Sequence, residues 1–389
     1  MINDPERECL ATGMPRSLKG AGSMHRSIGT IITSLGLFFI YEDVMANRDI
    51  IVIGGSAGST GPLRTILGAL TSNLNAAVVA TVHVTAASDG ILRLASSASP
   101  HLPVKVAENG ERVLPGTVYL APANRNLFLM GDRVVLGKGP RENLARPAID
   151  ALFRSAALSH GPRTIGVLLS GKMNDGSSGL ATIKQAGDIA IVQLPSDAAE
   201  PEMPMSALAA TAVDLTASAS DLAKAIMRLS SEPPGPARAL PADVRLEVEI
   251  AASGGAVPRQ IKEIADPSPL TCPECGGVLS EVRFEKPLRF RCQIRHAFTA
   301  RTLAAKNRNS VDFALRVALR ILEERITLVS RMAKDAVEAE RASMARLHEE
   351  RAEEYRKQAN VLRTAILRGM KEEASRQSAW ELSDWDVRG

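Results

Sequence analysis

The sequence has few aromatic residues, few cysteines and little net charge. Aromatics make up 3% of its 389 residues, so a core must rest on Ala, Leu, Val and Ile. Four cysteines in a chain of this length do not indicate a disulfide framework. A net charge of +4 is too small to imply nucleic-acid binding or a membrane-surface protein. Apolar residues make up 45% and charged residues 23%, which is typical of a globular protein, and the length suits two or three domains. We expect the protein to be located in the cytoplasm.

Long apolar runs are also missing. The apolar stretch over residues 28–40 contains Thr, Ser and Gly and spans about 13 residues, where a transmembrane helix needs about 20. Glu42 and Asp43 follow it in place of a small-residue cleavage site, which argues against a signal peptide. We expect residues 1–45 to be a disordered or mis-started extension, with Met45 as an alternative start, and no membrane insertion.

Short apolar runs alternate with helical patterns between residues 46 and 230. This alternation predicts an α/β fold, a doubly wound and mostly parallel sheet with helices on both faces. Residues 101–140 interrupt it with short β-like runs, which predict a β excursion off the main sheet with a hairpin turn at Met130–Arg133. The predicted strands are 50–54, 77–84, 117–121, 164–170 and 189–193, and the predicted helices are 60–70, 87–97, 147–159, 177–187 and 219–230.

Three reactive side chains follow three of these predicted strands. Ser56 lies in the glycine-rich stretch after the first strand, His83 ends the second, and Asp175 lies in the loop after the 164–170 strand. The carboxyl ends of parallel strands share one edge of a sheet. A serine hydroxyl needs a base to take its proton, and the imidazole needs a carboxylate to orient it. This set therefore predicts nucleophilic acyl transfer.

The glycines around Ser56 allow two interpretations. They fit a G-x-S-x-G elbow, with the Ala57 N–H and backbone of the Gly171–Met173 loop as oxyanion donors. A phosphate or dinucleotide loop is the common alternative, but the glycine spacing of neither G-x-G-x-x-G nor a P-loop is present. Other histidines and acids compete for the remaining roles: His101, His160, Asp150, Asp197 and Glu200.

At these residues the chain resembles the chemotaxis protein-glutamate methylesterase family (CheB-type catalytic domain). The resemblance implies that Ser56 is the nucleophile, His83 the base and Asp175 the orienting acid. It implies hydrolysis of glutamate methyl esters on the cytoplasmic helices of chemoreceptors, with glutamine deamidation as a second reaction. The similar segments are VIGGSAGS, VVATVHV, AENGERVLPGTVYLAPANRNL, GPRENLARPAIDALFRSAA, IGVLLSGKMNDGSSGLATIKQAG and EMPMSAL.

The sequence departs from the family pattern in three places. Ser59 replaces a glycine after the nucleophile, and Lys172-Met173 stands where the family often has Met-Gly. The residues before position 46 are too few for the phosphate-receiver domain of well-known members, so we do not expect control by phosphorylation in cis. Arg146, in a loop before a predicted helix, is expected to line the substrate groove.

Three of the four cysteines cluster late in the chain. Cys272-x₂-Cys275 is followed after 16 residues by Cys292-x₃-His296, the spacing of a zinc ribbon with four protein ligands. With no ligand position left for water, we expect structural Zn²⁺ in residues 269–303 and no cofactor for catalysis. A redox dithiol is the alternative, but it leaves Cys292 and His296 unexplained.

The rest of the chain is expected to be a linker and a helical extension. Residues 231–268 are rich in proline and small residues and predict a linker. Residues 308–375 predict a helical hairpin. Its outer faces are either solvent-exposed or form a docking or dimerisation element. Residues 376–389 are expected to be a tail. The apolar stripes are Leu315, Leu319, Leu322, Ile326 and Val329 on the first helix, and Leu347, Tyr355, Leu362 and Ile366 on the second.

Taken together, the sequence predicts a serine hydrolase that demethylates chemoreceptor glutamates. A methyltransferase or another signalling protein is a further expected partner, and no nucleic acid is expected. Two alternatives stay open: a catalytically degenerate signalling adaptor, and a serine esterase or amidase with another substrate.

Overall fold

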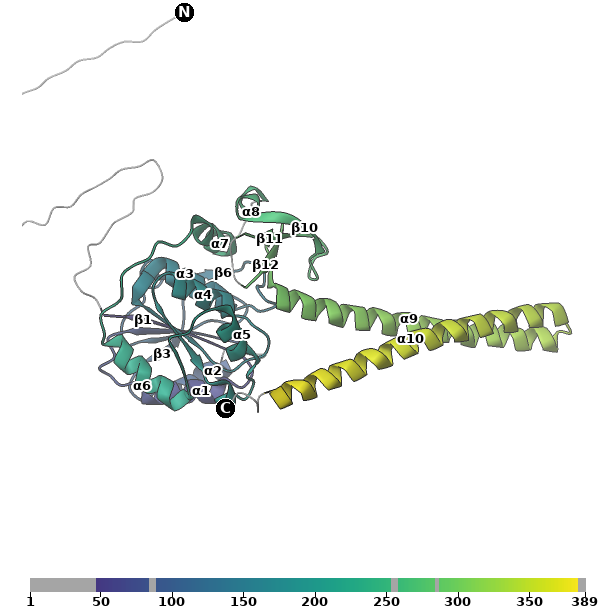
Figure 1. Cartoon of the computed structure of the whole chain (residues 1–389), viewed down its shortest axis with the longest axis horizontal. Coiled ribbons are helices and arrows are strands. Elements are labelled where there is room, and N and C mark those ends of the chain that lie inside the picture. Colours follow the sequence, from purple (N-terminus) through teal and green to yellow (C-terminus); the bar gives the residue numbers. More distant parts are fainter. Residues whose placement is uncertain (1–46, 84–88, 253–257, 284–286, 384–389) are drawn as a thin grey trace, which may run out of the picture. The chain divides into compact units, whose positions relative to one another are not determined.

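The structure, a computed structural model, describes residues 47–83, 89–252, 258–283 and 287–383 (Figure 1). The predicted extension over residues 1–45, with Cys9 and Met45, lies outside the described residues.

A seven-stranded sheet forms the centre of the larger domain. Its strand order is β3-β4-β2-β1-β7-β8-β9, and every pair of neighbours is parallel. The predicted fold class is therefore confirmed. The strands are β1 (Ile50–Gly55), β2 (Ala77–Val82), β3 (Val104–Val106), β4 (Val118–Leu120), β7 (Thr164–Leu168), β8 (Ile189–Gln193) and β9 (Leu215–Ala217).

Helices cover both faces of this sheet because its strands are apolar on both sides. Ile51 and Ile53 of β1 pack with α1 (Thr60–Ala69), α2 (Asp89–Ala98) and α6 (Ala219–Ser230). Ile50 and Val52 point the other way, toward α3 (Ile149–His160), α4 (Ser177–Gln185) and α5 (Glu202–Ala210). Figure 1 shows α1 and α6 on one side of the strands and α3 and α4 on the other. A run of β-branched residues in a central parallel strand has this two-sided burial.

The segment between residues 101 and 140 contributes to two sheets. Its first part forms β3 and β4, which belong to the main sheet. The sequence pattern predicted the strand at β4 but not the one at β3. The rest forms an antiparallel hairpin of β5 (Asn126–Met130) and β6 (Arg133–Gly137), with the turn at the predicted position and Gly131 at φ +57°.

The segment expected to be a linker contains two helices, α7 (Ala242–Ala252) and α8 (Pro258–Ile264). Val248 and Ala251 of α7 pack against Phe128 and Ala148 of the larger domain. The apolar positions Val244, Val248 and Ala251 follow the 3-4 spacing of a helix, and this pattern, rather than the prolines before it, decides the local structure.

A small antiparallel sheet follows, of four strands in sequence order, here called the ribbon. It consists of β10 (Ala265–Thr271), β11 (Val278–Val282), β12 (Arg289–Cys292) and β13 (Ala297–Thr299). Its core around the cysteines is small: Cys272, Leu279, Phe290, Cys292 and Phe298 pack with Leu303, which lies beyond the last strand. Ala265 and Val282 pack instead with Ile261 and Ile264 of α8.

Two long helices, α9 (Ala300–Glu338) and α10 (Ala342–Ser383), form an antiparallel pair. Arg363 donates to Glu323 at 2.8 Å, and Arg325 lies over the ring of Tyr355. The predicted stripe of α9 is partly buried, as are Tyr355 and Leu362, and Ile366 is buried, whereas Leu347 is exposed. No helix among the described residues combines the length and apolarity needed to cross a membrane.

Candidate active site

The three predicted catalytic residues lie at one edge of the main sheet. Strand β1 pairs with β2 on one side and with β7 on the other. The pairing continues just past the strand ends: the Ser56 N–H donates to the Ser170 carbonyl at 2.9 Å, and the His83 N–H donates to the Gly55 carbonyl at 3.0 Å. Ser56 therefore follows the central strand, with His83 and the Asp175 loop on the strands beside it.

The turn that carries Ser56 depends on its glycines. A Cβ at Gly54 would lie 2.2 Å from Cγ2 of Ile149 at the start of α3, and Gly58 has φ +74°. Ser59, the departure from the family pattern, is buried and donates its hydroxyl to the Ser56 carbonyl at 2.6 Å. Ser59 therefore adds a hydrogen bond within the turn that carries Ser56.

Asp175 is buried and accepts four hydrogen bonds. Its Oδ2 faces Nε2 of His83 at 3.0 Å and accepts from the Ile149 N–H at 2.7 Å. Its Oδ1 accepts from Asn143 Nδ2 at 3.0 Å and from the Asp150 N–H at 3.3 Å. Burial alone would raise the pKa of Asp175, but the His83, Asn143 and Ile149 hydrogen bonds outweigh it and lower the pKa. The carboxylate therefore stays ionised and fixes the imidazole.

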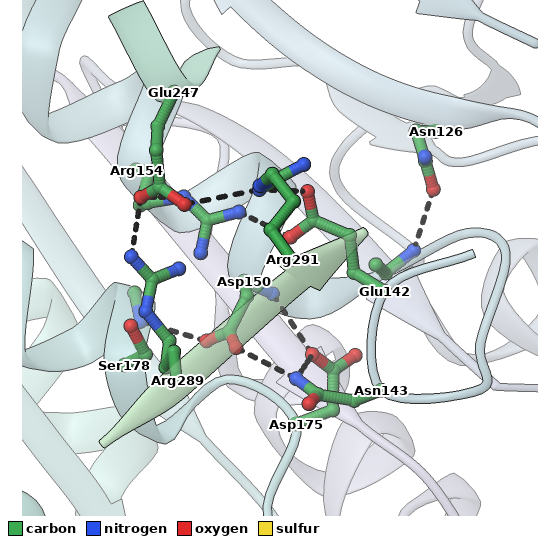
Figure 2. A network of polar contacts seen from close by, with 12 residues as sticks. Asn126, Glu142, Asn143, Asp150, Arg154, Asp175, Ser178, Glu247, Arg289 and Arg291 are labelled. Atoms are coloured by element: carbon green, nitrogen blue, oxygen red, sulfur yellow. Dashed lines mark hydrogen bonds and ion pairs between the residues drawn. The ribbon is translucent and has the colours of Figure 1, made fainter. Parts of the chain in front are cut away.

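A second carboxyl, Asp150, lies beside Asp175 on α3. Its Oδ2 accepts from the same Asn143 amide at 2.8 Å (Figure 2). Its Oδ1 accepts from the Gly179 N–H at 2.7 Å. Burial, and then the charge of Asp175, raise the pKa of Asp150 to about 7. Of the two neighbouring acids, Asp150 is the one that takes a proton, which leaves the charge on the residue that faces His83.

The other competitors have different surroundings. His160 ends α3, opposite the end that Asp175 caps, and its ring lies 3.1 Å from Arg163; burial lowers its pKa to about 4. Asp197 accepts from Gln193 and from the Ala219 N–H. None of these contacts of His160 and Asp197 involves Ser56.

The loop before Asp175 has most of its backbone N–H groups engaged. Gly171 donates to the Glu200 carbonyl at 3.0 Å, and Met173 donates to Glu202 Oε2 at 2.9 Å. Within the described residues, the N–H groups of Lys172 and Ala57 have no acceptor. Of the expected oxyanion donors, Lys172 and Ala57 thus keep a free N–H, and Met173 does not.

Arg146 is held by the chain around it. Its guanidinium donates to Asn124 Oδ1 at 2.9 and 2.6 Å and to the Gly139 carbonyl at 2.8 Å. These bonds tie the loop before α3 to the ends of the β5–β6 hairpin.

Comparison with known proteins identifies the larger domain. The family model described as CheB methylesterase matches residues 51–226. A protein-glutamate methylesterase/protein-glutamine glutaminase of Leptospira interrogans is 38% identical over 184 residues, which are 47% of this chain and 95% of that protein. The chain belongs to the CheB methylesterase family. The predicted family and enzyme class are thereby confirmed.

One further relative shows how far the similarity extends, and one solved structure is also similar. A protein of the same name from Moorella thermoacetica is 36% identical over 186 residues, 46% of this chain but 44% of that longer relative. The crystal structure of the catalytic domain of Thermotoga maritima CheB methylesterase is 31% identical and covers 46% of this chain and 98% of that domain, with a TM-score of 0.45. The family model ends at residue 226, so the ribbon and the α9–α10 pair of this CheB-family chain lie beyond the residues that it matches.

The predicted metal ligands converge in the ribbon. One ligand atom each from Cys272, Cys275, Cys292 and His296 lies within 4.8 Å of the others, a group that could hold a metal ion. Cys275 Sγ is 3.7 Å from Cys292 Sγ, and His296 Nδ1 is 3.6 Å from Cys272 Sγ and 3.5 Å from Cys292 Sγ.

Sequence reasoning missed the residues that surround the acid. Asn143, Asn174 and Thr299 form hydrogen bonds around Asp175, and Thr299 is 156 positions from Asn143. The segment containing Asn143 was singled out only by resemblance, and no local pattern marks Thr299.

Proposed function

We propose that this chain is a serine hydrolase that cleaves γ-glutamyl methyl esters on chemoreceptors and releases methanol, with glutamine deamidation as a second reaction. The observation that carries the proposal is the ionised Asp175 carboxylate on His83, at the sheet edge where Ser56 follows the central strand. The names of the relatives, which combine methylesterase and glutaminase, support both reactions.

The proposed mechanism begins at the imidazole. Because Nε2 of His83 donates to Asp175, Nδ1 is the ring nitrogen left to take the Ser56 proton. The Ser56 Oγ–carbon bond forms, the methoxy group leaves with the proton from His83 as methanol, and an acyl-enzyme remains. Water then attacks the acyl carbon, His83 takes and returns a proton, and the glutamate carboxylate and the free Ser56 hydroxyl are restored.

The oxyanion of each tetrahedral intermediate needs donors that are free before substrate binds. We assign these to the N–H groups of Ala57 and Lys172, which make no other hydrogen bond in the described part of the chain. Only the backbone of Lys172 takes part, because its side chain is exposed and pairs with Glu200 at 3.4 Å.

For the ribbon we propose structural Zn²⁺. Zinc–sulfur bonds of about 2.3 Å and zinc–nitrogen bonds of about 2.05 Å, in a tetrahedron, separate two sulfurs by about 3.8 Å and a sulfur from a nitrogen by about 3.6 Å. Three of the six separations, one of 3.7 Å between two sulfurs and two of 3.6 and 3.5 Å between a sulfur and the His296 nitrogen, fit this geometry. Four protein ligands complete the coordination, so the metal stabilises the fold and has no open position for water. Thiolate ligands of this kind suit a cytoplasmic protein.

Methanol release from methylated receptor membranes tests the function. The wild-type chain is compared with Ser56→Ala, His83→Ala and Asp175→Asn, and with Ser59→Gly, which restores the family residue and serves as the matched control. We expect release by the wild type and by Ser59→Gly, and background release by the Ser56 and His83 variants. Receptor binding without release by the folded wild type would favour an adaptor, and release by Ser56→Ala would exclude this nucleophile.

A further inference from the structure

The ribbon reaches the catalytic acid through Asn143. The Thr299 N–H, at the end of β13, donates to Asn143 Oδ1 at 2.9 Å, and the Asn143 N–H donates to the Ala297 carbonyl at 2.8 Å. Because a donor from the ribbon occupies the amide oxygen, the NH₂ group of Asn143 must face the other way, toward Asp150 and Asp175. The ribbon thus decides the orientation of the amide that holds the acid.

A second contact holds the residue before the acid. The Thr299 hydroxyl lies 2.7 Å from Nδ2 and 2.9 Å from Oδ1 of Asn174, and the Thr302 hydroxyl donates to Asn174 Oδ1 at 2.7 Å. All three side chains are buried. Thr299 of the ribbon therefore contacts both Asn143, which donates to Asp175, and Asn174, which precedes Asp175 in the chain.

Buried ion pairs attach β12, the strand beside β13, to the residue before Asn143 and to α7. Arg291 of β12 donates from Nη2 to Glu142 and to Glu247, both at 3.0 Å, and Arg289 pairs with Glu247. Arg154 of α3 pairs with Glu142, the residue before Asn143. Figure 2 shows these arginines from β12 and α3 converging on the two glutamates. All five side chains are at most 3% exposed, so moving β12 away would leave buried charges without their partners.

Two of the metal ligands lie at the two ends of the turn between β12 and β13. Cys292 ends β12, His296 precedes β13, and the Cys292 N–H donates to the His296 carbonyl at 3.0 Å. The core cluster around the ligands has six buried residues, five from the ribbon and Leu303 from α9, and two of them, Cys272 and Cys292, are ligands. So small a core leaves the fold of the ribbon dependent on the metal.

We propose that metal binding at Cys272, Cys275, Cys292 and His296 clamps the β12–β13 turn onto the acid loop, and that Thr299 is a positioning residue for Asp175. The ribbon is then an integral part of the active site of this chain. The expected effect of the metal on catalysis rests on the proposed function. The effect of the metal on the position of Asp175 does not.

The first experiment removes the metal from the full-length chain by Cys275→Ser, which replaces an exposed ligand outside the β12–β13 turn. Metal content, methanol release and amide hydrogen exchange are measured together. We expect zinc loss, a kcat at least tenfold lower with KM within about threefold, and faster exchange at the Ile149 and Asp150 amides, which donate to Asp175. Exchange in β1 and β7 should not change. A metal-free chain with wild-type exchange at Ile149 and wild-type kcat would overturn the proposal.

A second pair of variants keeps the metal and tests Thr299 itself. Thr299→Val removes the hydroxyl that contacts Asn174 and should lower kcat about tenfold, whereas Thr299→Ser retains a hydroxyl and should restore kcat. Arg283→Ala, which breaks an exposed ion pair with Asp266 in the same ribbon, is the control and should match the wild type. Equal kcat in the Val and Ser variants would contradict the role of Thr299.

These readouts separate the two proposals. If the wild type releases no methanol, the proposed function fails, and the exchange at Ile149 still decides whether the metal holds Asp175. If the wild type is active and its exchange does not depend on the metal, the clamp fails and the proposed function stands.

Discussion

The Asp175 carboxylate caps helix α3 through the Ile149 N–H, 2.7 Å from Oδ2, the oxygen that also faces His83. The residue at the N-cap position, Ala148, has a methyl side chain that cannot accept a hydrogen bond. A helix N-terminus favours negative charge, so the fold itself helps to keep Asp175 ionised. If Asp175 is the catalytic acid that we propose, it also has a structural role as the cap of α3, and its substitutions must affect activity and stability together.

Asp175→Asn tests this double role. All four of its partners are donors, so the amide NH₂ must face at least one of them, and the imidazole loses its carboxylate. We expect a fall in kcat of about 10,000-fold and a loss of stability of about 1–3 kcal/mol. Methanol release and urea unfolding measure the two effects. Ser56→Ala should lose activity alone, and equal stability losses in both variants would contradict the capping role.

The buried ion pairs predict a large effect of Glu247→Gln. This substitution keeps the size of the side chain but removes the charge that faces Arg289 and Arg291 in the interior. We expect destabilisation of about 3–5 kcal/mol, measured by urea unfolding. Asp266→Asn, in an exposed pair with Arg283, is the control and should leave the unfolding midpoint unchanged. Similar midpoints for both variants would show that the buried network is not integral to the fold.

Asp188 predicts a pH dependence of stability. It is buried between α4 and β8, and burial raises its pKa to about 8. The folded chain keeps this proton up to about pH 8, whereas the unfolded chain loses it near pH 4. The contribution of Asp188 to the free energy of unfolding therefore falls as pH rises between these values, by at most about 1.4 kcal/mol per pH unit.

The variant Asp188→Asn has no such proton, so its stability relative to the wild type should increase with pH up to about 8 and then level off. Urea unfolding at pH 5, 7 and 9 measures this difference. A constant difference at all three pH values would mean that the native carboxyl titrates normally.

Lys172→Met restores the residue that the family often has at this position. The Lys172 side chain is 63% exposed and contacts Glu200, and we assign only its backbone N–H to the oxyanion. We therefore expect kcat for methanol release to stay within about threefold of the wild type. A change of a hundredfold or more would show that the charge of the side chain acts on the reaction.

Much of the fold could be predicted from the sequence because its central elements are long and periodic. Each of Ser56, His83 and Asp175 follows an apolar run, and such runs become buried parallel strands with their ends at one edge. The strands β3 and β9 were missed because each has only three residues and lies at an edge of the sheet. Helix α5 was missed because it is short and contains Pro204.

The surroundings of the acid could not be predicted in the same way. Asn143 has φ +48°, a conformation that asparagine tolerates, but its contact with Thr299 depends on the docking of the ribbon. Arg289 and Arg291 belong to a stretch that is only mildly basic, and their burial requires Glu142 and Glu247 from distant segments. Contacts of this kind arise from tertiary packing and have no local signature.

The most direct test of the central claim is to trap the acyl-enzyme. The wild-type chain is mixed with a peptide that carries a γ-glutamyl methyl ester, quenched in acid within milliseconds, digested and analysed by mass spectrometry. The account predicts a glutamyl acyl group on the hydroxyl of Ser56, absent in Ser56→Ala. Methanol release without any acyl group on Ser56, or with the label on another residue, would contradict it.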